Sequence, residues 1–383
     1  MSWKSLLRFE LKAIFTNPAL LFTVFGGIVI YSFLYPLPYS EQLPREQRVA
    51  VVNLDHSQLS RKLIRMADAT AQVEITEHLG SIYSAQQQLE QSNIDGILVI
   101  PENFYRDVLL GKSPTLAYAG NAALFLVYGT VVEGLASAGG TLGAHIKVSH
   151  MVMDGHNIAL AANQYSAMKL NMRPIFNTTM GYINYVVPAV FVLILHQTLL
   201  IGVSIIGGEH NERRAEGEIG YWMTYPAWKI IFVRTILFVL IYIPLTMYYF
   251  GWSFDYYDIS KLAKVPELLL LTVPFLVSVI SLGLVIGQLI PRRELATLIV
   301  LLSSLPLVFS AGFIWPTAEL PTIIKGFAQL VPSTPAINGF LRLNQMGASF
   351  TQVAPYFWQM WLQAVIYFML AWGLMSRNRS HLE

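Results

Sequence analysis

The sequence has no cysteine and few charged residues. Without a thiol, disulfides, thiolate metal sites and cysteine nucleophiles are excluded. Asp, Glu, Lys and Arg make up only 13% of the 383 residues, and the net charge of +2 is too small to favour a nucleic-acid partner. Apolar residues make up 54%, and the mean hydropathy is +0.50. This composition is that of a membrane protein.

A phosphate-binding loop is also missing. Such a loop has the pattern G-x-x-x-x-G-K-[ST] and opens a helix. The only Gly-Lys-Ser, at Gly111 to Ser113, has Arg106 in place of the first glycine and runs directly into Pro114. The chain therefore has no ATPase motif. No spacing of residues predicts a catalytic group, a metal site or a cofactor of its own.

The N-terminal segment combines an amphipathic stretch with an apolar one. In residues 1–18, Lys4, Arg8 and Lys12 recur every four residues opposite an apolar face, which predicts a cytoplasmic interfacial amphipathic helix. Residues 19–38 are apolar and long enough for a hydrocarbon core of about 30 Å. No small-x-small cleavage site follows, so we interpret them as an uncleaved first transmembrane helix.

Residues 39–182 have the composition of a soluble domain. Arg48 to Leu54 and Ile94 to Ile100 are typical of buried strands, and Gln58 to Ala69 of a helix capped by Asp55 or Ser57. The alternation predicts an extracytoplasmic (periplasmic) α/β domain of the two-layer kind. A long segment with helical spacing follows, and we expect Gly139-Gly140 to interrupt it.

Residues 183–376 contain five further apolar segments of membrane-spanning length. They are Val186 to Gly207, Ile230 to Phe250, Leu268 to Ile290, Leu295 to Trp315, and Phe357 to Met375. With six spans, Arg213, Arg214, Arg292 and Arg293 share a side with both termini, including the tail 377–383. The positive-inside rule places that side in the cytoplasm of a multi-pass inner-membrane protein.

A seventh span at Asn121 to Lys147 is rejected, because it would move those arginines outside and bury Glu133 in lipid. The segment 316–356 is too polar and too rich in proline to cross the membrane. Within it we expect two short helices, Pro321 to Leu330 and Pro335 to Asn344, lying on the outer face or dipping into it. The fold class is therefore a membrane all-α bundle of six transmembrane helices with an inserted extracytoplasmic α/β domain and long helix.

The densest charge cluster lies between the second and third spans, in a predicted cytoplasmic loop over 208–228. Its charged residues adjoin an aromatic patch that includes Trp222 and Tyr225. A plain solvated connection is the alternative, but charge beside aromatic residues favours an interface.

Among the polar residues inside predicted spans, where such residues are costly, His196, Gln197 and Arg234 are candidates for a functional role. His196 and Gln197 are candidate pathway residues, through a proton relay or substrate contact, although an interhelical hydrogen bond is the favoured interpretation. Arg234 is expected to extend its guanidinium to the membrane surface.

The order of these elements carries a family resemblance. Glu212-Arg213-Arg214-Ala215-Glu216-Gly217 supplies the charges and glycine of a characteristic cytoplasmic loop, Trp222 its hydrophobic position and Tyr225-Pro226 its end. Glu218 and Gly220 depart from that pattern, which has threonine and glutamate there. With this loop, the chain resembles permeases of ABC transporters of the type-2 exporter class, in the drug-exporter-like branch with a large external domain.

The resemblance implies a permease subunit that exports a hydrophobic or amphipathic substrate, drug-like first and lipid or polysaccharide second. A separate cytoplasmic ABC ATPase would bind ATP and Mg and dock on Glu212, Arg213, Arg214, Glu216, Gly217, Trp222, Tyr225 and Pro226. The permease would form a homodimer or a heterodimer in membrane lipid, and a periplasmic adaptor protein is a further expected partner. The alternative is a non-transporting sensor or assembly scaffold that is coupled to the same kind of ATPase.

Overall fold

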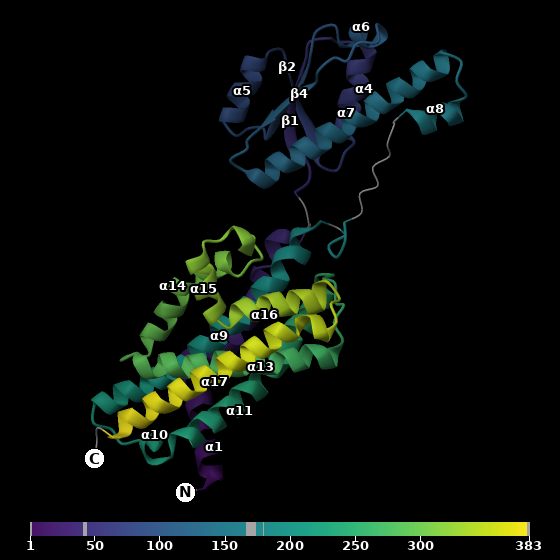
Figure 1. Cartoon of the computed structure of the whole chain (residues 1–383). Coiled ribbons are helices and arrows are strands. Elements are labelled where there is room, and N and C mark those ends of the chain that lie inside the picture. Colours follow the sequence, from purple (N-terminus) through teal and green to yellow (C-terminus); the bar gives the residue numbers. More distant parts are fainter. Residues whose placement is uncertain (1, 41–43, 166–173, 179, 381–383) are drawn as a thin grey trace. The chain divides into compact units, whose positions relative to one another are not determined.

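The computed structural model describes residues 2–40, 44–165, 174–178 and 180–380. It divides the chain into a helical bundle, formed by residues 1–42 and 174–383, and an α/β unit, formed by residues 43–173 (Figure 1). The α/β unit is thus an insertion between the first helices of the bundle and the rest of it.

The bundle is built from helices alone in the part of the chain that the structure describes. They are α1 (Trp3–Phe15), α2 (Pro18–Leu21), the π-helix η1 (Phe22–Gly26), α3 (Gly27–Leu34), η2 (Leu37–Tyr39), α9 (Tyr182–Ala215), α10 (Tyr221–Thr224), α11 (Ala227–Met247), η3 (Tyr248–Ser253), α12 (Phe254–Tyr256), α13 (Val265–Leu289), α14 (Glu294–Ser310), η4 (Thr317–Glu319), α15 (Thr322–Leu330), α16 (Ser333–Phe340), η5 (Leu341–Gln345) and α17 (Phe350–Ser380).

Six helical segments among the described residues are long and apolar enough to cross a membrane. Those in the bundle are Pro18–Tyr39, Tyr182–Ala215, Ala227–Tyr256, Val265–Leu289 and Phe350–Asn378, and they contain five of the six predicted spans. The sixth candidate, Phe125–Met153, belongs to the α/β unit. The structure is therefore that of a membrane helical bundle with an inserted α/β unit.

The predicted fifth span is wrong at its C-terminal end. It was expected to reach Trp315, but α14 ends at Ser310 after 17 residues, about 25 Å at 1.5 Å per residue. Gly312 follows with φ +93°, a left-handed conformation that suits glycine and ends the helix.

Helix α9 lies at the centre of the bundle. It contacts α3, α11, α13, α14 and α16. In its most apolar stretch of 18 residues, 94% are buried. Its apolar residues cover every face over Val186–Ile206, which is the pattern of a helix enclosed by others.

Both short helices predicted between the last spans are present, at α15 and α16. Helix α15 exposes most of its residues, whereas α16 buries Thr334, Pro335, Ile337 and Phe340. Contacts with α9, α13 and α17 surround α16. The second short helix therefore enters the bundle instead of lying on its surface.

The α/β unit contains a four-stranded sheet in the order β2-β1-β3-β4. Its strands are β1 (Gln47–Asn53), β2 (Val73–Leu79), β3 (Gly96–Ile100) and β4 (Ala117–Gly120), and its helices are α4 (Gln58–Asp68), α5 (Ile82–Glu90), α6 (Phe104–Leu109), α7 (Phe125–Met153) and α8 (Ile158–Gln164). Strand β1 pairs in parallel with β2 and β3, and β4 runs antiparallel to β3. Of the two predicted caps, Ser57 caps α4, accepting a hydrogen bond from the Ser60 amide.

The predicted two-layer arrangement is wrong, because helices cover both faces of the sheet. Val49 and Val51 of β1 face a core shared with α4, α6 and α7. The alternate residues Ala50 and Val52 face a smaller core that includes Ala85 of α5. This alternation along one strand fills two cores and gives three layers.

Helix α7 runs without a break through Gly139-Gly140, so the predicted interruption is also wrong. It ends at Met153, and its C-cap Asp154 precedes Gly155, whose φ is +91°. Although α7 is apolar enough to span a membrane, Val131 and Leu135 pack on the sheet. This packing explains its hydrophobicity and supports the rejection of a seventh span.

Candidate functional site

The charged run between the second and third spans is helical and not a loop over most of its length. Helix α9 continues to Ala215, so Glu212, Arg213 and Arg214 lie on its last turns. At Gly217, φ is +83°, and the amides of Gly217 and Glu218 donate to the carbonyls of Arg214 and Arg213. This is a Schellman cap, whose left-handed residue is usually glycine. The predicted loop 208–228 is therefore reduced to a short connection and α10.

Helices α9 and α13 cross at glycines close to this run. A Cβ on Gly207 would lie 2.6 Å from the Gly287 Cα, so only hydrogen fits. Beside this crossing, the Asn211 side-chain amide donates to the carbonyls of Gly287 and Ile290, at 2.9 and 2.8 Å. Small residues that let backbones approach are a common means of packing membrane helices. The end of α9 and the end of α13 are thus held as one piece.

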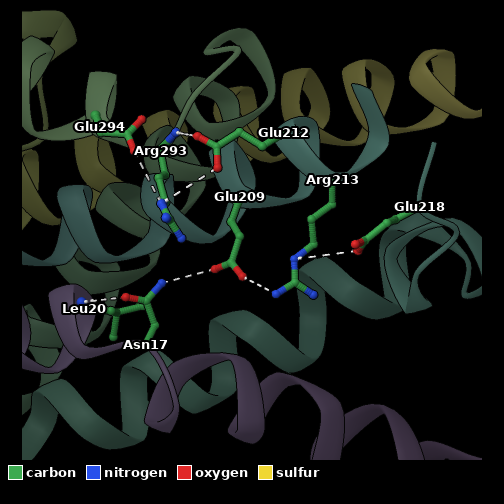
Figure 2. Close-up of polar contacts among 8 residues, drawn as sticks. All are labelled: Asn17, Leu20, Glu209, Glu212, Arg213, Glu218, Arg293 and Glu294. Carbon is green, nitrogen blue, oxygen red and sulfur yellow. Dashed lines mark hydrogen bonds and ion pairs between the residues drawn. The ribbon is translucent and has the colours of Figure 1, made fainter. Parts of the chain in front are cut away.

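Glu212, which directly precedes Arg213 and Arg214, contacts Arg293 of the other arginine pair. Its Oε1 accepts a 2.8 Å hydrogen bond from the Arg293 amide, and its Oε2 lies 3.8 Å from the Arg293 Nε (Figure 2). We call the region formed by residues 209–218 and 292–294 the charged end of the bundle.

A second chain of polar contacts connects the charged end to the start of α2. Glu209 accepts hydrogen bonds from the Asn17 Nδ2 at 3.1 Å and from the Arg213 Nη2 at 2.8 Å, and Arg213 lies 4.0 Å from Glu218 (Figure 2). Glu218, one of the two departures from the family pattern, is therefore part of this network. Because Arg213 and Glu218 are exposed, each of the two ion pairs that Arg213 makes stabilises the fold by about 1 kcal/mol or less.

Helix α1 is fixed to α11 by a buried ion pair. The Arg234 Nε and Nη2 each donate a 2.8 Å hydrogen bond to a carboxylate oxygen of Glu10, and both side chains are 0% exposed. The expectation that Arg234 reaches the membrane surface is thus wrong. Glu10 lies between Leu6 and Ile14 on the buried face of α1, so this face packs on protein.

The aromatic residues of the connection fold back onto the bundle. Tyr221 stacks on Phe9 of α1 at 5.4 Å, and Trp222 stacks on His210 of α9 at 4.3 Å. A Cβ on Gly220 would lie 2.1 Å from the Trp222 ring, so this departure from the family pattern makes room for the tryptophan. Burial, and then the negative charge of Glu10, raises the pKa of the Tyr221 phenol.

The predicted docking residues therefore differ in accessibility. Tyr225 is 6% exposed, and its hydroxyl lies 3.0 Å from the Ser5 hydroxyl, so it positions α1 and does not face a partner. Arg213, Glu216, Gly217 and Pro226 are exposed, whereas Glu212, Arg214 and Trp222 are half-buried. Ile219 was not among the predicted docking residues, although it is an apolar residue next to Glu218 and is 81% exposed.

These elements enclose an open groove of about 700 Å³. Its walls come from α1, the start of α2, the end of α9, and α10. The lining residues are Phe9, Lys12, Ala13, Thr16, Asn17, Pro18, Glu209, His210, Arg213, Glu218, Ile219, Gly220, Tyr221, Trp222, Thr224 and Arg293. Apolar, acidic and basic side chains share this groove, as they do in protein interfaces.

The two candidate pathway residues lie near the middle of α9. Gln197 donates a 2.8 Å hydrogen bond to the Ser304 hydroxyl of α14, which confirms the favoured interpretation for this residue. His196 is 0% exposed, and neither ring nitrogen has a hydrogen-bond partner among the described residues. His196 therefore does not face an open path in this structure.

The lookalike of a phosphate-binding loop does not have the structure of one. Gly111 to Ser113 follow α6, and a segment without regular secondary structure leads from them to β4, so they do not open a helix.

Comparison with known protein families identifies the family of this chain. The model of the ABC-2 family transporter proteins matches residues 18–372, which is nearly the whole chain. No curated protein matches it. The match begins at the proline that starts α2, so α1 and Glu10 lie outside it. The chain belongs to the ABC-2 transporter family and is a multi-pass membrane permease of the kind that works with an ABC ATPase.

Proposed function

We propose that this permease moves a hydrophobic or amphipathic substrate outward across a bacterial inner membrane. ATP and Mg bind a separate ABC ATPase, which hydrolyses the ATP and docks on the charged end of the bundle. Drug-like molecules are the first substrate class and lipid or polysaccharide the second. The spans are predominantly apolar, which supports a substrate that is itself apolar in part.

The observation that carries the proposal is the groove at the charged end. It joins elements that lead into different spans: α1 is fixed to α11 through Glu10 and Arg234, and α9 is fixed to α13 through Gly207 and Asn211. A partner seated in the groove therefore contacts two rigidly linked helix pairs. Its closure on ATP binding would tilt both pairs as bodies, because packed helices transmit motion with little internal deformation.

Charge reversal of Arg213 and Arg214 together with Trp222→Ala tests this docking surface. We expect the ATPase to be lost on co-purification and substrate-stimulated hydrolysis to fall to the level of the isolated ATPase. Ile219→Glu should weaken binding without touching the Glu209 network. Lys325→Glu on exposed α15 is the matched control and should bind normally. If the triple variant keeps both the ATPase and its stimulation, the docking surface lies elsewhere.

The charged end and both termini are proposed to be cytoplasmic, and the α/β unit extracytoplasmic. Protease added to intact spheroplasts should then cut between Tyr39 and Arg173 and spare Glu216 to Gly220. Cleavage at Glu216 to Gly220 without cleavage between Tyr39 and Arg173 would show that the topology is the reverse of the proposed one.

We also propose a dimer with a second permease, identical or different, because α14 has an exposed apolar face. Leu301, Leu302 and Leu305 are 59%, 70% and 68% exposed there. Such a face needs either lipid or another membrane protein against it. A periplasmic adaptor protein is the remaining proposed partner, and cross-linking in cells would identify both.

A sensor or assembly scaffold without transport is the second candidate. It is favoured by the complete burial of His196, one of the two candidate pathway residues. Uptake of a labelled substrate into inside-out vesicles separates the two functions. ATP-dependent uptake supports export, whereas ATPase binding without any transport supports the sensor.

A further inference from the structure

We propose that the α/β unit binds a single-chain amphipathic anion, such as a fatty acid, in a cavity between α6 and α7. The cavity has a volume of about 490 Å³, within the range of about 300–1,000 Å³ typical of small-molecule sites. The proposal depends on this unit alone and goes beyond the proposed function, because it requires neither transport nor the ATPase.

The floor of the cavity is apolar and belongs to the core of the unit. Phe104 and Val108 contribute from α6, and Leu142 contributes from α7. These three side chains are 3%, 8% and 1% exposed. Leu116 and Ile146, both half-buried, complete the wall. An acyl chain placed here would exchange water for hydrocarbon, which yields about 0.8 kcal/mol per buried methylene.

The rim of the cavity is cationic. Lys112, Lys147 and His150 line it. Lys112 lies 3.8 Å from Asp107, which Arg106 also approaches at 3.6 Å, so these three side chains keep a net positive charge. Lys147 is exposed and has no ion pair or hydrogen bond among the residues described. An anionic head group would therefore find at least one uncommitted cation beside the apolar floor.

Glycines keep the cavity open. Gly139 and Gly143 lie one turn apart on α7, and both line it. A Cβ on Gly143 would meet no atom within 4 Å. Because glycine destabilises a helix interior by about 1 kcal/mol relative to alanine, the pair costs stability where larger residues would pack. Room for a ligand is a physical reason for that cost.

The segment Gly111 to Ser113, which resembles a phosphate-binding loop only in its sequence, lines this cavity. Gly111 has φ +72°, which turns the chain after α6 and brings Lys112 and Ser113 to the rim. The donors lie at the rim and the floor is hydrocarbon, so the site suits one acidic head and one chain. A nucleotide or sugar phosphate would leave most of its polar groups against the apolar floor, at a cost.

The test uses the full chain in phosphatidylcholine nanodiscs and palmitate that carries a diazirine near the middle of its chain. After illumination, mass spectrometry should find label in peptides from α6 to Leu116 and from α7 between Gly139 and His150. Gly143→Leu, which fills the cavity, should reduce this label about tenfold. Gly129→Leu is the matched control, because Gly129 lies on exposed α7 surface and its Cβ would also meet nothing within 4 Å.

Charge is tested with Lys147→Glu and with palmityl alcohol that carries the same diazirine. The variant should weaken palmitate labelling roughly three- to tenfold and leave labelling by the alcohol unchanged. Equal labelling by acid and alcohol in the wild type would overturn the anionic specificity. Label confined to the spans, or insensitive to Gly143→Leu, would overturn the site itself. Unchanged thermal unfolding of the variants would show that the unit remains folded.

Discussion

Glu10 and Arg234 meet through two hydrogen bonds of 2.8 Å, although 223 residues lie between them in the chain, and both side chains are fully buried. Neither charge is solvated, so each depends on the other. This pair links α1 to α11, and the stack of Phe9 on Tyr221 holds α1 beside α10.

Removing one member of this pair should be strongly destabilising. Arg234→Met or Glu10→Leu alone leaves an unpaired buried charge, and we expect the free energy of unfolding to fall by about 3–5 kcal/mol. The double variant removes both charges and should recover most of the loss. Denaturant unfolding of the purified protein measures all three. Additive losses in the double variant would contradict the argument.

The crossing of α9 and α13 should not tolerate a side chain at Gly207. Gly207→Val places atoms 2.6 Å from the backbone of Gly287, where nothing flexible can move away. We expect a loss of about 1–3 kcal/mol from overpacking, together with weaker ATPase coupling as Asn211 loses its carbonyl partners. Gly373→Val on α17 is the control, since a Cβ there meets nothing within 4 Å. Equal stability of the two variants would refute the close crossing.

Gly220 is expected to be required by Trp222 and not by its own backbone. Gly220→Ala puts a methyl group 2.1 Å from the indole, so Trp222 should leave its stack on His210. Fluorescence of Trp222, in a background whose other tryptophans are phenylalanine, should shift to longer wavelength as the ring becomes hydrated. Gly217→Asn, at a position that asparagine tolerates, should leave the emission unchanged.

Alkaline pH should act on α10 through Tyr221. Its pKa is raised above the ordinary value of 10.0, by burial first and then by Glu10. The folded state therefore keeps a proton that the unfolded state loses above about pH 10. The contribution to stability is complete below pH 10 and falls as the pH rises further. Tyr221→Phe should remove this dependence, as measured by unfolding at pH 9 and pH 11; an unchanged slope would show that Tyr221 does not titrate as proposed.

Sequence patterns predicted local structure well where it depended on the apolar face of one element or on the length of one apolar segment. Strand β1 and helix α4 lie close to their predicted bounds, because alternation and capping are local signals. The two-layer prediction failed because α5 alone covers the second face. Periodicity shows that a helix buries a face but does not say against which side of a sheet it packs.

At the candidate site, the sequence predicted where the charged end lies in the chain. It did not predict its helical conformation or its tertiary contacts. The polar run indicated a break between spans, whereas tertiary contacts keep it helical to Ala215: Glu212 has Arg293 and Asn211 has the end of α13. Gly220 and Glu218 were visible as departures from a pattern. Their reasons, room for the Trp222 ring and contact with Arg213, became visible only once distant residues were side by side.

The sequence by itself determined the membrane class of this protein, the inserted α/β unit, most of the spans and the absence of an ATPase motif. These features follow from the composition, from the lengths of the apolar segments and from the spacing of apolar residues, all of which can be read from residues that are neighbours in the chain. Tertiary structure alone decided that α9 lies at the centre, that Arg234 is paired with Glu10, that α14 stops short, and that α16 enters the bundle. Each of these depends on which buried polar or apolar group meets which partner across the chain, and local sequence carries no such information.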